Sequence, residues 1–356
     1  MSEKKGLLSG KRGIIMGAAN NRSIAWGIAK KAADEGAELA FTYQGEQLEK
    51  RVRPLAESVG SNIVLPCDVT DEASIDAVFA ALEKEWGKLD FLIHAIAYSD
   101  KHELTGRYVD TTAGNFARSM NISCYSFTAV AQRAEKLMTE GGSMITLSYY
   151  GAEKVIPHYN VMGVAKAALE ASVKYLARDL GPKNIRVNSI SAGPIKTLAA
   201  SGIGDFRYIL KWNELNSPMG RNVSIEEVGN AGVYFISDLS SGVTGENHHV
   251  DAGYHTTAAQ AYCALSERRL PVFGRAGWSM PILGRGEVLR YQRQGGKSGK
   301  ASKRAEDRAY LVGTYGVKLS WYGYLRQTLK YLEDTKDTLD RPIGLIHYSR
   351  DTPDEW

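Results

Sequence analysis

The sequence has few of the features that mark secreted, membrane-spanning or metal-stabilised proteins. Its 356 residues include three cysteines, Cys67, Cys124 and Cys263, which are odd in number and lack the spacing of metal ligands. No apolar run approaches the roughly 20 residues that cross a bilayer. The first residues also lack the apolar segment and cleavage site of a secretion signal. We therefore expect a cytoplasmic protein that uses no membrane, no disulfide framework and no metal.

The sequence also lacks a large charge excess over most of its length. The residues from Ala258 to Trp356 hold 17 Lys and Arg against 11 Asp and Glu, a net of +6. Because the whole chain carries +4, the rest carries −2. The basic balance therefore says little about the ligand of the main part. For the last 100 residues, a disordered or weakly folded extension is favoured over a nucleic-acid-binding segment, and we expect no nucleic-acid partner.

What the sequence does have is a regular alternation of apolar strand patterns and helical patterns. We expect strands at 12–18, 38–44, 62–69, 89–97, 142–150, 185–193 and 245–253. We expect helices at 23–37, 45–60 with an interruption at Pro54, 72–87, about 112–139 and 159–181. Strands separated by helix-length segments indicate βαβ units. The prediction is an α/β fold, a Rossmann-type doubly wound parallel sheet with helices on both faces.

After His255 this alternation stops, so we divide the chain into a domain at 1–256 and a poorly patterned extension at 257–356. "GGKSGK" in the extension is not a phosphate-binding loop, because Tyr291 stands where the first glycine is required. The segment 317–334 has the pattern of one helix. The extension is either a native appended segment or a read-through or frame-shifted translation, and its lack of periodicity favours the second.

The turn after the first strand, at Gly17, is a candidate cofactor site. It precedes a helix that begins near Ser23 and Ile24, and a helix N-terminus offers free N–H groups to a dinucleotide pyrophosphate. The glycine spacing differs from the usual G-x-G-x-x-G. Taken alone, the turn is therefore nearly as consistent with a structural turn and a serine cap.

The ends of the next three strands strengthen the cofactor interpretation. Gln44 ends the second strand, where a side chain often contacts the adenosine ribose, and no arginine follows it to bind a 2′-phosphate, which favours NADH over NADPH. Asp68, followed by Val69, ends the third strand. Its carboxylate suits the adenine amino group or, alternatively, caps the next helix. Ile96 lies between two alanines at the end of the fourth strand, where small residues let a ribose approach the backbone.

The stretch "HYNVMGVAK" at 158–166 carries a tyrosine and a lysine seven positions apart. Seven residues are about two helical turns, so Tyr159 and Lys166 project from the same face. Met162 stands one turn before the lysine and has no proton to transfer. The alternative is an ordinary helix start with a chance lysine.

Three motifs resemble those of the short-chain dehydrogenase/reductase superfamily and, within it, of the bacterial enoyl-acyl-carrier-protein reductases. They are "LSYYG" at 147–151, "HYNVMG" at 158–163 and "SAGPIKTLAASGI" at 191–203. The resemblance covers about residues 5–256. The carbonyl-reducing members normally carry a tyrosine one turn before the lysine and a serine about 13 residues earlier. This chain has Met162 and Tyr149 at those positions.

The resemblance implies roles for particular residues. Tyr149, Tyr159 and Lys166 would be catalytic, and Lys166 would also bind the nicotinamide ribose. Ser99 would line the substrate pocket, or alternatively be an exposed loop serine. The implied cofactor-binding residues are Gly17, Ser23, Ile24, Gln44, Asp68, Val69, Ile96, Lys166, Ile195, Thr197, Leu198 and Ala199.

The implied activity is the NADH-dependent reduction of the trans-2 double bond of enoyl thioesters on acyl carrier protein. This is the last step of the type II fatty acid elongation cycle. The implied assembly is a homotetramer, unless the extension interferes. The basic residues expected after the substrate lid are reduced to Arg207 and Lys211, with Gly204 and Tyr208 where further lysines are typical.

Two other functions stay open at this point. One is an NAD(P)-dependent reductase of the same fold that acts on another activated alkene or a carbonyl, and Met162 counts against a carbonyl. The other is a dinucleotide-binding relic without turnover, which the intact Tyr159 and Lys166 count against.

Overall fold

The computed structural model of the chain describes residues 6–198, 200, 203–204 and 206–257, together with the backbone of two short strands, 271–273 and 279–281. The chain divides into two compact units, Met1–Gln260 and Ala261–Trp356. In the second unit, β8 (Pro271–Phe273) and β9 (Ser279–Pro281) pair antiparallel. The segment 317–334, predicted as a helix, lies outside the described residues.

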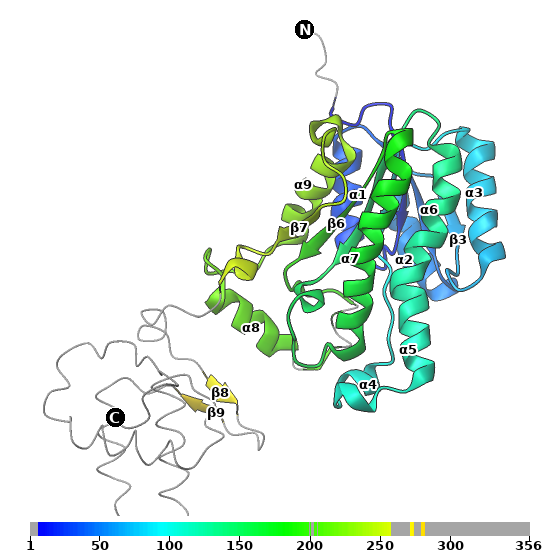
Figure 1. The fold of residues 1–356 in the computed structure, drawn as a ribbon. Coiled ribbons are helices and arrows are strands. Elements are labelled where there is room, and N and C mark those ends of the chain that lie inside the picture. The colour runs from blue at the N-terminus through cyan, green and yellow to red at the C-terminus, as the bar shows by residue number, and fades with distance from the viewer. Residues whose placement is uncertain are drawn as a thin grey trace, which may run out of the picture. The chain divides into compact units, whose positions relative to one another are not determined.

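The first unit is built on a seven-stranded sheet in which every neighbouring pair is parallel (Figure 1). The strand order is β3-β2-β1-β4-β5-β6-β7. The order reverses between β1 and β4, so the crevice at the carboxyl ends of these two strands is where this fold binds ligands. The strands are β1 (Arg12–Met16), β2 (Glu38–Tyr43), β3 (Ile63–Pro66), β4 (Phe91–His94), β5 (Gly142–Ser148), β6 (Ile185–Ala192) and β7 (Asn247–Val250).

Helices cover both faces of the sheet, which confirms the predicted doubly wound α/β fold. Each face has its own apolar core cluster. One face is covered by α3 (Glu72–Trp86), α6 (Ser126–Leu137) and α7 (Asn160–Leu180). The other face is covered by α1 (Ile24–Asp34), α2 (Glu46–Ser58) and α9 (Ile225–Ile236).

Shorter helices lie at the ends of these layers. They are α4 (Lys101–Leu104), α5 (Ala113–Met120), α8 (Phe206–Asn216), the π-helix η2 (Asn121–Tyr125) and the 3₁₀ turns η1 (Tyr108–Asp110), η3 (Tyr150–Ala152), η4 (Gly181–Lys183), η6 (Asp238–Ser240) and η7 (Tyr254–Thr256). Because η2 joins α5 to α6 without a break, the helix predicted at 112–139 contains a π-bulge, a feature that often occurs beside functional sites.

The predicted interruption of the second helix is wrong. α2 continues through Pro54, whose ring lies on the exposed side of the helix. Among the described residues, three helices were not predicted, α4, α8 and α9. A sequence signal for α9 was present, because Ser224 and Glu227 form a capping box at its start.

α9 packs closely against α1, which carries the candidate cofactor turn. A Cβ atom on Gly229 would lie 2.6 Å from the carbonyl oxygen of Gly27, and one on Gly27 would lie 2.5 Å from the carbonyl oxygen of Ile225. The two backbones therefore touch through positions where any side chain would push the helices apart.

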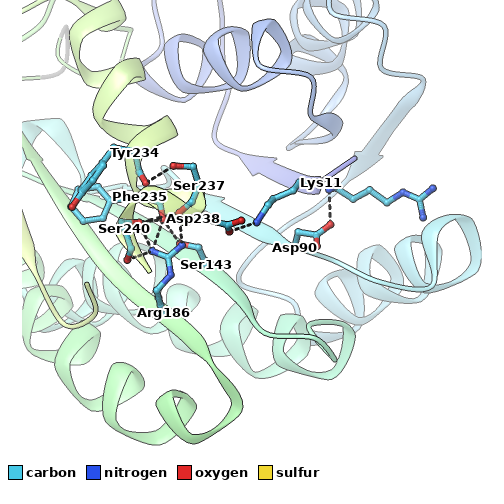
Figure 2. Close-up of polar contacts among 10 residues, drawn as sticks. Lys11, Asp90, Ser143, Arg186, Tyr234, Phe235, Ser237, Asp238 and Ser240 are labelled. Carbon is cyan, nitrogen blue, oxygen red and sulfur yellow. Dashed lines mark hydrogen bonds and ion pairs between the residues drawn. The ribbon is translucent and has the colours of Figure 1, made fainter. Parts of the chain in front are cut away.

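A half-buried arginine holds the C-terminal end of α9 (Figure 2). Arg186 of β6 donates to the carbonyl oxygen of Phe235 at 2.8 Å, to that of Ser237 at 3.0 Å and to that of Ser240 at 3.0 Å. The Ser143 hydroxyl of β5 also donates to the Phe235 carbonyl. These bonds satisfy carbonyl groups that a helix end leaves without helical partners, and they place a cation at the negative end of the helix dipole.

Among the described residues, none of the helices is both long and apolar enough to cross a membrane.

Candidate active site

A cavity of about 370 Å³ opens at the carboxyl ends of β1, β4, β5 and β6. It contains most of the residues that the sequence predicted for the site. Those in its lining are Gly17, Ser23, Ile24, Ile96, Ser99, Tyr149, Tyr159, Lys166, Ile195, Thr197 and Leu198. Ala199 lies outside the described residues. The sheet order thus brings together segments from Gly17 to Leu198, which are 181 positions apart in the chain.

The turn at Gly17 has a backbone that favours glycine. Its φ is +98°, and a Cβ atom would lie 2.2 Å from the Ala95 carbonyl oxygen of the neighbouring strand end. The Ser23 hydroxyl accepts from the N–H groups of Ala19 and Asn20, both at 3.0 Å. Ser23 stands at the N-cap position of α1, but its side chain closes the turn and makes no cap bond. The turn is therefore rigid and leaves the start of α1 facing the cavity.

The predicted adenosine contacts lie together, away from this cavity. The Gln44 amide donates to the Asp68 carboxylate at 3.0 Å, at the ends of β2 and β3. The pKa of Asp68 is lowered because the Thr70 hydroxyl and N–H donate to its carboxylate. The N-cap of α3 is Asp71, which accepts from Ala73 N–H, so Asp68 does not cap this helix. Val69 packs partly buried against a core cluster.

Tyr159 and Tyr149 pack edge to face in the cavity, with ring centroids 5.0 Å apart. Tyr159 is 7% exposed. Burial raises the pKa of both hydroxyls, and the neighbouring tyrosine adds to the effect at Tyr159. Both side chains are therefore hydroxyl donors over the neutral range.

Lys166 is buried on the same helix, two turns into α7. Its ammonium donates to the Leu147 carbonyl oxygen at 2.6 Å. Burial lowers its pKa to about 8, while Cys124 and Glu170 act in the opposite direction. A cation that titrates near neutral pH inside a cavity is typical of a functional site.

Met162 occupies the turn between Tyr159 and Lys166 and also lines the cavity. It is 6% exposed, and the Ser123 hydroxyl of η2 lies 3.8 Å from its sulfur. The position of a carbonyl reductase's acid is thus filled by a thioether in contact with the π-helix. The sequence predicted Met162 here but gave no sign of Ser123.

The backbone around Tyr159 is strained on both sides. His158 has a φ of 62° and Asn160 a φ of 39°, values that are uncommon for residues with a side chain. The Asn160 amide donates to the carbonyl oxygens of Glu103, Leu104 and Gly106, at 3.1, 3.2 and 3.0 Å. These three bonds tie the start of α7 to α4 and fix the direction of Tyr159. Sequence reasoning missed Asn160, because only the fold brings it to α4.

The loop after β6 closes one side of the cavity. Thr197 donates its N–H to Ile195 at 2.8 Å, and its hydroxyl accepts from Ala200 N–H at 3.1 Å. Leu198 is 45% exposed. On the opposite side, Ser99 exchanges hydrogen bonds with Asn115 while lining the cavity, so it is not simply an exposed loop serine. Sequence reasoning missed further lining residues, namely Lys101 and Leu104 of α4, Phe206 of α8 and Ile203, which precedes α8.

Comparison with known proteins agrees with this geometry. Residues 17–255 match the family described as Enoyl-(Acyl carrier protein) reductase. The chain is 70% identical over 261 residues to enoyl-(acyl-carrier-protein) reductase (NADH) 1 of Rhizobium meliloti (strain 1021), covering 73% of this chain and 96% of the relative.

Two crystal structures are similar over the same part of the chain. The reductase from Anaplasma phagocytophilum in complex with NAD has 61% identity and a TM-score of 0.70, covering 73% of this chain and 99% of that one. The Bacillus cereus reductase with NADP⁺ and an indole naphthyridinone has 52% identity and a TM-score of 0.70. The match covers 71% of this chain and 100% of that one. These findings confirm the resemblance predicted from the motifs. The chain therefore belongs to the enoyl-(acyl carrier protein) reductase family.

Proposed function

We propose that this chain reduces the trans-2 double bond of enoyl thioesters on acyl carrier protein, with NADH as the hydride donor. The observation that carries the proposal is the arrangement of α7 in the cavity. Tyr159 and Lys166 face it two turns apart, with Met162 between them. Because the Met162 side chain has no proton to transfer, a carbonyl substrate would have no proton donor beside the nicotinamide ribose. The more distant Tyr159 suits a thioester oxygen that is separated by two carbon atoms from the carbon that accepts hydride.

The residues of the site fit a dinucleotide. The tight Gly17 turn leaves no room for a side chain, so a pyrophosphate can approach the backbone and the start of α1. Gly17, Ser23, Ile24 and Ile96 would hold the dinucleotide, with Gln44, Asp68 and Val69 at the adenosine end. Across the cavity, Ile195, Thr197, Leu198 and Ala199 would contact its nicotinamide half, and Lys166 its ribose. When bound, the dinucleotide would supply hydride to C3 of the enoyl thioester, and delivery of a proton to C2 completes the reduction.

The chain's own residues then control the charge that develops on the substrate. The Tyr159 hydroxyl donates a hydrogen bond to the thioester oxygen, where negative charge gathers as an enolate forms. The raised pKa of Tyr159 keeps this proton in place at neutral pH. Lys166 keeps the local potential positive, which favours the enolate. Tyr149 packs on the Tyr159 ring and narrows its range of orientations. Ser99, which lines the same cavity, would contact the substrate.

NADH is favoured over NADPH by the end of β2. Gln44 is held by Asp68, and acidic Glu46 and Glu49 begin the next helix. A 2′-phosphate would meet carboxylates there instead of an arginine. The R. meliloti relative is named as an NADH enzyme and the A. phagocytophilum reductase was crystallised with NAD, while the B. cereus reductase was crystallised with NADP⁺.

The proposed macromolecular partner is acyl carrier protein, the carrier in the names of the relatives. Of the two basic residues expected to face it on α8, Lys211 forms an ion pair with Glu214 at 3.0 Å, so Arg207 is the stronger candidate contact. A homotetramer and a cytoplasmic location stay predictions from the sequence. So does the division into a reductase domain at 1–256 and an extension at 257–356.

The test is NADH oxidation by the purified full chain, followed by absorbance, with three substrates in parallel. They are crotonyl-CoA, a crotonyl acyl-carrier-protein thioester and a 3-ketoacyl thioester. We expect oxidation with both crotonyl thioesters, faster with the carrier-bound one, and none with the ketoacyl thioester.

The other outcomes would contradict the proposal in different ways. Oxidation with only the ketoacyl thioester would make the chain a carbonyl reductase. Binding of NADH without oxidation of any substrate would make it a dinucleotide-binding relic.

A further inference from the structure

Glu170 is a half-buried acidic side chain beside the proposed catalytic groups. It lies on α7 one turn after Lys166, and helix side chains four positions apart share a face. Its carboxylate accepts a hydrogen bond from the Ser148 hydroxyl, at the end of β5. A buried carboxylate costs free energy unless donors or a cation compensate for the lost hydration. The groups around Glu170 therefore indicate what it does.

The bond to Ser148 is the middle one of three contacts between the end of β5 and α7. Leu147, one residue before Ser148, accepts from the Lys166 ammonium at 2.6 Å. Tyr149, one residue after it, packs against the Tyr159 ring with centroids 5.0 Å apart. The segment that orients both proposed catalytic groups is thus anchored to α7 at its centre by Glu170.

The titratable groups that act on Glu170 and Lys166 come from several elements. Glu153, next to η3, and His249 of β7 act on Glu170, and these two bind each other at 2.7 Å. Burial raises the pKa of Glu170, and its bond from Ser148 opposes the shift. On the Lys166 side lie Cys124 of η2 and the buried His94 of β4, while Glu170 also acts on Tyr159, the N-cap of α7.

We propose that Glu170 is a positioning residue of the active site, which anchors the end of β5 through Ser148 and places a negative charge one helical turn from the ammonium of buried Lys166. This inference rests on the proposed function for its effect on turnover. Its electrostatic part concerns Lys166 alone and holds without any substrate.

The first test is Glu170→Gln, which keeps the size and the hydrogen-bonding oxygen but removes the charge. Loss of the charge lowers the pKa of Lys166 further below about 8. The fall of kcat/KM at alkaline pH then begins at a lower pH. At a pH above this pKa, each half-unit fall in the pKa of Lys166 reduces its protonated fraction by about threefold. We expect about a threefold loss of kcat/KM near pH 8.5 and a much smaller loss near pH 6.5.

Ser148→Ala separates anchoring from charge. It removes the donor but leaves the carboxylate, so kcat is expected to fall at every pH while the alkaline limb stays at the wild-type pH. The matched control is Asp179→Asn, which removes an exposed acidic charge from the last turn of the same helix. This variant should retain the wild-type kcat and pH profile.

A direct measurement distinguishes failure of this inference from failure of the proposed function. The NMR titration of Lys166, labelled with ¹³C at Cε and assigned by its loss in Lys166→Arg, needs no substrate. A lower midpoint in Glu170→Gln than in the wild type supports the role of the charge, even if no enoyl thioester is reduced. An unchanged midpoint in Glu170→Gln would overturn the charge role, and a wild-type kcat in Ser148→Ala would overturn the anchoring role. If Glu170→Gln does not fold, the same titration in Glu170→Ser replaces it, with a lowered midpoint supporting the charge role and an unchanged midpoint overturning it.

Discussion

At the scale of single residues, burial decides which groups in the cavity can give or hold a proton. Tyr159 and Tyr149 have raised pKa values, because a buried phenolate is poorly solvated. The pKa of Lys166 is shifted in the opposite direction, because burial disfavours its ammonium form and lowers the pKa to about 8. The cavity thus sets two neutral donors beside a cation whose charge is the most sensitive to pH.

Replacing Tyr159 by phenylalanine tests the donor directly. The change removes one hydroxyl and leaves the ring packed against Tyr149. Loss of one preorganised donor to a developing oxyanion costs about 3–4 kcal/mol of barrier, or roughly 100- to 1,000-fold in kcat. NADH affinity, measured by fluorescence titration, should stay close to that of the wild type.

Tyr175→Phe is the matched control for this variant. Tyr175 is 75% exposed on the same helix, far along α7 from the cavity, so its loss should change neither turnover nor affinity. Turnover of Tyr159→Phe equal to that of the wild type would remove the proposed oxyanion donor.

His94 makes stability depend on pH. It is completely buried in β4 between the hydroxyls of Thr146 and Ser126, and burial together with the Lys166 charge lowers its pKa to about 3. The unfolded chain binds a proton to this group near pH 6.5. The stability contributed by neutral His94 is therefore complete above about pH 6.5 and is lost as pH falls toward 3. Near pH 5 the loss is about 2 kcal/mol.

The measurement is the free energy of urea unfolding at neutral pH and near pH 5, in the wild type and in His94→Gln. Glutamine does not titrate, so the variant should be less stable at neutral pH but lose less stability on acidification. His102→Gln, at an exposed position of α4, is the control and should behave as the wild type. Equal loss of stability in His94→Gln and the wild type would contradict this assignment.

Some residues of the site could be predicted from the sequence and others could not, depending on whether sequence spacing alone fixes their relation. Tyr159, Met162 and Lys166 could be predicted, because a helix fixes their relation through sequence spacing alone. The contacts of Glu170 with Ser148 and of Asn160 with α4 could not be. Each joins positions 22 or more residues apart through the packing of α7 against another element, which sequence spacing does not encode.

At the scale of elements, α9 shows how a helix outside the cavity can control it. It touches α1 backbone to backbone at Gly27 and Gly229, and α1 begins at the candidate pyrophosphate site. Arg186 fixes its other end to β6. The position of α9 is therefore transmitted to the start of α1 through rigid contacts.

Arg186→Gln should destabilise this arrangement. A hydrogen bond from a charged donor contributes about 1.5–3 kcal/mol, and the substitution removes several that end on buried carbonyl groups. We expect the free energy of unfolding to fall by about 3 kcal/mol, measured by urea denaturation. Arg51→Gln, an exposed arginine on α2, should change it little. A loss no larger than that of Arg51→Gln would mean that other groups hold the end of α9.

The strands were the elements that the sequence predicted best. In a parallel sheet covered on both faces, strands are continuously apolar, which sets them apart from amphipathic helices. The α9 helix was missed, although "SIEE" at 224–227 is a capping box. The π-helix η2 could not be predicted, because the single extra residue of a π-bulge leaves no periodic pattern.

At the scale of the whole molecule, the reductase fold is complete within the first unit. All seven strands of the large sheet and both apolar clusters on its faces lie between residues 8 and 252. The stretch that aligns with the R. meliloti relative spans 261 residues and 96% of that protein. The apolar burial that drives folding is therefore supplied without the residues after Gln260.

A chain ending at Gln260 should accordingly fold and keep its activity. We expect the same thermal unfolding midpoint as for the corresponding transition of the full chain, and the same kcat with crotonyl thioesters, because the cavity and the cores are unchanged. Light scattering should give this shortened chain the mass of a tetramer. A tetramer from the full chain as well would mean that residues 261–356 leave the subunit interfaces free, whereas a smaller assembly would mean that they obstruct them. A shortened chain that fails to fold would show that the first unit depends on the second, and would overturn the division of the chain near residue 256.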